Sequence, residues 1–207
     1  MPKRKTYGYL LLVFLVISGL AGTPTNDVLS KKERKSAADY MKETKIELFK
    51  SLDGLSVKQI NYKPDAETLS IKECVFHLAE AEKIFWSMLE KSMDSPSNTK
   101  RKDDLKFSDD EVIEMAEKNN TETKALISNL RSSNSYKNLD KALSDFKMNR
   151  ASHIKYIKLT SEDLRDHIVE MPFGTLDCYQ LCLMISSYTR EHINLLNELR
   201  SREDFPE

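Results

Sequence analysis

The sequence "LDCYQLCLMISSYTREHINLLNELRS" (residues 176–201) decides the fold, because it reads as one long helix. Apolar side chains cover nearly all of its circumference as far as Tyr188, and beyond that point they follow a single helical stripe. A helix that is apolar on every side is buried, so the first half of this one packs against several neighbours. His192 lies on the stripe, one turn after Tyr188.

Three other segments have the same helical spacing of apolar residues. The first has Ser30 as its cap and ends near Gly54, the second opens with Ser70 and Glu73 at capping-box spacing, and the third covers residues 139–159. A shorter helix follows Ser108, whereas residues 94–107 read as a polar linker and 119–138 give no firm prediction. Residues 169–177, "VEMPFGTLD", break the pattern without forming a convincing strand. We therefore predict an all-α four-helix bundle.

Composition agrees with a helical domain and excludes other classes. The chain has 207 residues, 31% of them charged and only 5 Gly, which suits amphipathic helices. Beyond the N-terminal segment, the basic cluster "KRKDD" at 100–104 contains acids of its own, so no concentrated basic surface is expected. We predict no nucleic-acid partner.

The N-terminus has the layout of a secretory signal peptide, with "MPKRK" before the apolar stretch "YGYLLLVFLVISGLAG". We expect a signal peptide at 1–22, a flexible linker at 23–30 and the helical domain at 31–207, with no membrane span in the mature domain. Cleavage would remove three positive charges and take the net charge from −1 to −4. The alternative is an uncleaved anchor. Either way the domain is exported, to the periplasm or the extracellular space, or tethered there.

The three cysteines, Cys74, Cys178 and Cys182, all lie in apolar helical stretches. An oxidising compartment favours disulfides, but Cys178 and Cys182 are four residues apart on one helix, where a bridge is geometrically awkward. We predict buried structural thiols.

Two stretches of the sequence carry motifs that occur together in one known family. Residues 159–206, "LTSEDLRDHIVEMPFGTLDCYQLCLMISSYTREHINLLNELRSREDFP", are similar to a "dLr" segment, a "P-x-G-x-L" turn and a final helix bearing H-x-x-x-H. Residues 55–82, "LSVKQINYKPDAETLSIKECVFHLAEAE", are similar to that family's second-helix region. The chain thus resembles the DinB-like family, and the resemblance covers roughly residues 31–207. It implies an up-down-down-up bundle, a divalent metal on three histidines in many members, and activities such as thiol-dependent transfers.

Position by position, the resemblance assigns two histidines and one departure. The family's second-helix histidine falls on His77, and the second histidine of H-x-x-x-H falls on His192. The first falls on Tyr188, and Leu69 stands where a Trp is common. The resemblance thus implies a metal site at His77, His192 and Tyr188 that has lost one imidazole.

The exchange of histidine for tyrosine weakens such a site. Zn²⁺ or Ni²⁺ needs three or four donors at about 2.0–2.2 Å, and a phenol with a pKa near 10 is a poor neutral donor. We expect a divalent metal to be absent or weakly bound. A third ligand could come from His153, Glu80 or Glu82, although none has the spacing of an established motif. His167 falls near a turn and is a weaker candidate.

Arg150 and His153 are further cleft candidates, since both lie on the apolar face of residues 139–159. A buried guanidinium needs a partner, and either a bundle carboxylate or a substrate anion would serve. Tyr188 is most simply a phenol bonded to His77 or His192, in the space where an ion would lie.

Three hypotheses follow for the function. The first is an exported DinB-like protein of unassigned activity with a vestigial or altered metal site, acting as a binding or accessory protein. The second is a metal-dependent hydrolase or transferase that uses His77, His192 and an atypical third ligand. The third is a homodimer whose main contact is made by apolar helix faces.

Overall fold

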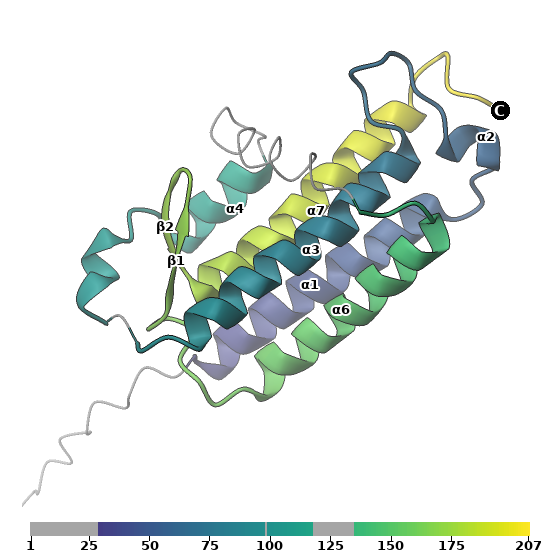
Figure 1. Ribbon diagram of the computed structural model, residues 1–207. Helices are drawn as coiled ribbons and strands as arrows, with labels where there is room; N and C mark the ends of the chain where they lie inside the picture. The colour runs from purple at the N-terminus through teal and green to yellow at the C-terminus, as the bar shows by residue number, and fades with distance from the viewer. Residues whose placement is uncertain (1–28, 98, 118–134) are drawn as a thin grey trace, which may run out of the picture.

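The computed structural model describes residues 29–97, 99–117 and 135–207 (Figure 1). The predicted signal peptide at 1–22, most of the linker at 23–30 and most of the stretch 119–138 lie outside the described residues. In the described part of the chain, no helix is long and apolar enough to cross a membrane.

Four long helices make up the body of the molecule: α1 (Lys31–Leu52), α3 (Ile71–Met93), α6 (Leu139–Leu159) and α7 (Cys178–Arg200). Both α1 and α3 pack against α6 and α7, so the helices that follow each other in the chain are not all neighbours in space (Figure 1). This arrangement confirms the predicted four-helix bundle.

Contacts at the helix ends fix the direction of each helix. Arg200 at the end of α7 donates to the carbonyl of Ser51 at the end of α1 over 2.9 Å, so these two helices run the same way. Arg34 near the start of α1 donates to the carbonyl of Ile157 near the end of α6 over 3.2 Å, so α6 runs the opposite way. The helix α3 runs alongside α6 in the same direction (Figure 1).

The helices begin where the sequence supplies caps. Ser70 with Glu73 forms the predicted capping box, and the predicted cap Ser30 forms another with Glu33; in both, each side chain bonds to the backbone N–H of the other residue. Gly54 has a φ of +73° just after α1, a conformation that a side chain disfavours.

A β-hairpin stands where no strand was predicted. Strand β1 (Ile168–Met171) pairs antiparallel with β2 (Gly174–Asp177), and Pro172 and Phe173 form the turn. Pro and Gly mark hairpin turns as well as helix breaks, and strands of four residues are too short for a clear period of two. Because residues 176–177 belong to β2, α7 begins at Cys178 and not at Leu176.

Shorter elements surround the bundle. The helix α2 (Val57–Ile60) lies within the connector before α3, where no helix was predicted, while η1 (Thr99–Asp104) precedes α4 (Asp109–Glu117). The predicted helix after Ser108 is confirmed as α4, which packs on α7. Arg165 links the start of α1 to the start of α4, because its guanidinium pairs with Glu33 at 2.9 Å and with Asp109 at 2.7 Å.

Candidate functional site

The structure brings His77 of α3 together with Tyr188 and His192 of α7. The ring centres of His77 and His192 are 5.1 Å apart, and those of Tyr188 and His192 are 4.4 Å apart. The Tyr188 hydroxyl is hydrogen-bonded to Nε2 of His77. All three side chains are buried, with at most 4% of any residue exposed. We refer to His77, Tyr188 and His192 as the His–Tyr cluster.

Local helix geometry fixes the two α7 members of this cluster. His192 follows Tyr188 by four residues, and its Nδ1 lies 2.8 Å from the backbone carbonyl oxygen of Tyr188. That bond assigns Nδ1 as the donor in the neutral ring, which leaves the lone pair on Nε2. Phe85 of α3 packs edge-on against the Tyr188 ring, with ring centres 5.5 Å apart. The phenol is therefore held between two helices.

The donor set meets only part of what a divalent metal requires. Two imidazoles bound to one Zn²⁺ ion at its usual Zn–N distance have ring centres roughly 5 Å apart, and the rings of His77 and His192 match this. The third donor does not fit, because the Tyr188 phenol is hydrogen-bonded to Nε2 of His77. Within residues 29–97, 99–117 and 135–207, no three His, Cys, Asp or Glu side chains are grouped to hold a metal ion. The residues as they lie do not fit a three-ligand site.

Arg150 and His153, the other cleft candidates, lie in a separate buried network around Glu82. Arg150 binds the Glu82 carboxylate with Nε at 2.8 Å and Nη2 at 2.5 Å, and Nδ1 of His153 lies 2.7 Å from the same carboxylate. The ring of Trp86 stacks on His153 with centres 3.7 Å apart. Glu82 therefore serves Arg150 and His153 rather than a metal, and the carboxylate partner expected for Arg150 is found.

This network joins all four bundle helices. Arg150 also donates to Thr44 Oγ1 on α1 over 3.0 Å and to Thr189 Oγ1 on α7 over 2.8 Å. Burial opposes ionisation of Glu82, but the charge of Arg150 and the hydrogen bonds from Arg150 and His153 outweigh it and hold the Glu82 pKa below its ordinary value. The carboxylate is ionised and fully paired, which indicates a structural role.

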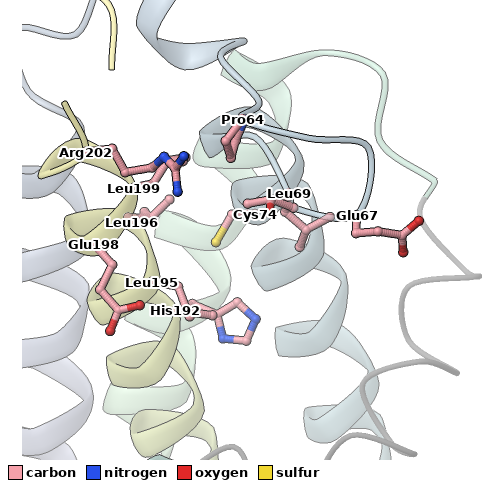
Figure 2. Close-up of a pocket in the computed structure, with 11 residues that line it drawn as sticks. Pro64, Glu67, Leu69, Cys74, His192, Leu195, Leu196, Glu198, Leu199 and Arg202 are labelled. Atoms are coloured by element: carbon pink, nitrogen blue, oxygen red, sulfur yellow. The ribbon is translucent and has the colours of Figure 1, made fainter. Parts of the chain in front are cut away.

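A pocket of about 370 Å³ opens beside the His–Tyr cluster, where α3 begins and α7 ends (Figure 2). The loop before α3 forms one wall and the last turns of α7 form the other. Buried side chains form the floor: His192, Cys74, Leu196 and Leu199. Its volume lies within the usual range for small-molecule sites, roughly 300–1,000 Å³. His192 is the member of the His–Tyr cluster that lines this pocket.

His167 and the three cysteines lie in surroundings that indicate a structural role rather than a part in a metal or catalytic site. His167 Nδ1 lies 2.9 Å from the backbone carbonyl oxygen of Ser92, away from the His–Tyr cluster. All three cysteines, which lie in the described part of the chain, are buried thiols, as predicted. Burial raises the pKa of Cys178 to about 12 and that of Cys182 well above its usual range. Neither is a nucleophile at neutral pH.

The sequence alone did not predict the pocket, which has one wall on α7 and one on the loop before α3. On α7 its signal is the spacing of His192, Leu195, Leu196 and Leu199, which places these side chains on one face of the helix. The other wall, including Leu69, comes from an irregular loop whose course no periodicity describes. A pocket between a helix and such a loop is visible only once both are placed.

Fold and site together describe a mostly helical four-helix-bundle protein with a buried His–Tyr cluster beside a small pocket. No protein-family model and no curated protein matches the sequence. The structure is similar to that of YfiT from Bacillus subtilis, with a TM-score of 0.59 and 12% sequence identity over 89% of this chain and 95% of YfiT. YfiT is described as a probable metal-dependent hydrolase with an unusual four-helix bundle topology. At this identity the likeness shows a shared fold alone.

Proposed function

We propose that this protein is an exported DinB-like binding protein, which holds a small organic molecule in the pocket beside His192 without a resident metal ion. One observation carries the proposal: the Tyr188 phenol is hydrogen-bonded to Nε2 of His77, in the position of the family's third imidazole. The bond uses the ring nitrogen that would otherwise bind an ion. The hydrogen-bonded cluster therefore holds His192 in a fixed position at the pocket floor without a metal ion.

Membership of the DinB-like family is part of the proposal. It is supported by the order of the motifs in residues 55–82 and 159–206, and by the fold shared with YfiT. The helix directions are compatible with the up-down-down-up topology of that family. Export is proposed from the signal-like sequence of residues 1–22.

The side chains define what the pocket can do for a ligand. His192 presents a ring of fixed tautomer, because its Nδ1 is committed to the Tyr188 carbonyl. Leu196 and Leu199 exclude water from the floor and favour an apolar ligand body. These features suit binding and orientation of a ligand.

A metal-dependent hydrolase is the second candidate. It is favoured by the 5.1 Å separation of the His77 and His192 rings, which suits two ligands of one ion, and by the description of YfiT. This function would require Tyr188 to release His77 and to bind the ion as a phenolate. The hydrogen bond between the Tyr188 hydroxyl and His77 would have to break before such an ion could bind.

Metal analysis separates the two candidates. We expect the full-length protein, purified without chelator and dialysed against Zn²⁺ or Ni²⁺, to hold well under one equivalent, and Tyr188→His to hold about one. Tyr156→His is the matched control, because it adds an imidazole on α6 outside the cluster, and it should gain no metal. One equivalent in the unmodified protein, lost in His77→Ala, would establish the metal-dependent alternative instead.

A homodimer and export remain proposals with their own measurements. Sedimentation at micromolar concentration tests the dimer, which is rejected if only monomer is seen. N-terminal sequencing of the protein recovered from outside the cytoplasm tests cleavage near Gly22. An intact N-terminus on a membrane-bound protein would support tethering instead.

A further inference from the structure

We infer that the pocket beside His192 selects a small cationic amphiphile, with a protonated amine on an apolar body of about ten non-hydrogen atoms. The inference rests on the proposed function, because it names the ligand class of that same pocket. Size sets the first limit. A pocket of about 370 Å³ has room for roughly a dozen water-sized groups at about 30 Å³ each.

The pocket walls specify the apolar body. Leucine side chains line it from both sides, with Leu69 on the loop and Leu195, Leu196 and Leu199 on α7 (Figure 2). Leu196 and Leu199 are buried at its floor, so a hydrocarbon chain placed against them would leave water and gain apolar contacts. A fully polar ligand would lose its bound water against these leucine side chains without compensation from them.

The charges around the pocket specify the sign of the polar end. Its charged lining residues are Glu67, Glu198 and Arg202. Asp204 matches the charge of Arg202, with contacts of 2.8 Å to Nε and 3.2 Å to Nη2. Neither Glu67 nor Glu198 has an ion pair within the described part of the chain. The lining therefore carries an excess of negative charge.

Glu198 is the better placed of the two carboxylates. It lies on the α7 wall at the exposed rim of the pocket, whereas the carboxylate of Glu67 points away from the pocket at its outer edge (Figure 2). Glu198 also lies in the last turn of α7, where the partial negative charge of the helix end favours a cation and disfavours an anion. An ammonium group above the leucines would be attracted to Glu198, and a carboxylate would be repelled.

Three probes of equal chain length test the inference: octylamine, octanol and octanoate. Each is titrated into the full-length protein at pH 7 and low salt, and binding is followed by isothermal calorimetry and by protection of Cys74 from iodoacetamide. We expect octylamine to bind about threefold more tightly than octanol, the range of a partly exposed ion pair, and roughly tenfold more tightly than octanoate. Added salt should shrink both preferences.

Variants assign the preference to Glu198. Glu198→Gln should weaken octylamine about threefold and leave octanol unchanged. Asp94→Asn, which removes a charge at the opposite end of α3, should change neither. Leu195→Trp should fill the pocket and abolish binding of all three probes.

Several results would overturn the inference, and they are distinct from failure of the proposed function. Equal binding of the three probes, or no effect of Glu198→Gln, would reject the cationic ligand and leave a metal-free binding pocket in place. Failure of every probe at millimolar concentration would also reject it. Neither result bears on the metal content of the Tyr188→His variant, which tests the proposed function separately.

Discussion

The hydroxyl of Tyr188 on α7 is hydrogen-bonded to Nε2 of His77 on α3, inside a bundle that excludes water from both groups. The bond joins two helices that run in opposite directions. It also occupies Nε2 of His77, a ring nitrogen through which His77 would otherwise bind a metal ion. The same contact therefore contributes to the stability of the bundle and defines the chemistry of the cluster.

Removal of this hydroxyl should destabilise the protein measurably. We expect Tyr188→Phe to lower the free energy of unfolding by about 1–3 kcal/mol, because the buried imidazole of His77 loses its bond to the phenol. Urea denaturation measures the change. Tyr156→Phe is the matched control, since its hydroxyl bonds to Glu162 on the exposed surface, and it should cost roughly 0.5 kcal/mol or less. Equal losses in the two variants would contradict a special contribution from the buried bond.

The buried ion pair predicts a larger effect. Arg150→Met should lower the free energy of unfolding by about 3–5 kcal/mol, because it leaves the charge of Glu82 buried without its main partner. The double variant Glu82→Leu, Arg150→Met should recover much of this loss, because no buried charge remains at the pair. The measurement is the unfolding midpoint in urea. A double variant less stable than Arg150→Met alone would show that the pair itself is strongly stabilising.

The sequence predicts the helices well because their signals are local. Ser70 with Glu73, and the apolar spacing that follows, determine the start of α3 without reference to the rest of the chain. The meeting of His77 with His192 was predicted from the resemblance, since no local pattern joins residues so far apart in the sequence. The expectation that Arg150 needs an anionic partner was general, whereas its identity as Glu82 depends on how α3 and α6 pack.

The features that the sequence did not predict depend on contacts between residues far apart in the chain. The hairpin of β1 and β2 has only four residues in each strand, and Gly174, with a φ of +145°, lies against the ring of Phe107. A side chain there would meet that ring at 2.9 Å. Phe107 comes from a segment far away in the sequence, so this requirement for glycine cannot be read from the residues around Gly174.

The lowered pKa of Glu82 predicts a specific pH dependence. Burial raises this pKa, but Arg150 and His153 together lower it by more than burial raises it. The Glu82 pKa therefore lies below the ordinary value of 4.5. The contribution of Glu82 to stability is therefore fully present above the ordinary value and is lost as the pH falls through the lowered value. We expect the stability difference between the unmodified protein and Glu82→Gln to shrink as the pH is lowered below 4.5.

Denaturation at a series of pH values measures that difference. Because the two proteins share every other carboxylate, acid effects elsewhere cancel in the comparison. His153 contacts the same carboxylate, so the experiment is repeated in a His153→Asn background to separate the share of the imidazole. A difference that stays constant from neutral pH to acid would contradict an ionised Glu82 with a lowered pKa.

The position of Cys74 in the pocket predicts selective reactivity among three buried thiols. Cys74 lines the pocket beside His192, whereas Cys178 and Cys182 are fully buried and burial raises the pKa of each. We expect iodoacetamide to alkylate Cys74 at least about tenfold faster than the other two in the native protein, since access and thiolate content both control the rate. Mass spectrometry of digested samples measures each site. The fast phase should vanish in Cys74→Ser, and all the thiols should react alike in denaturant. Equal rates at Cys74 and Cys178 in the native protein would show that the pocket does not admit small molecules as far as its floor.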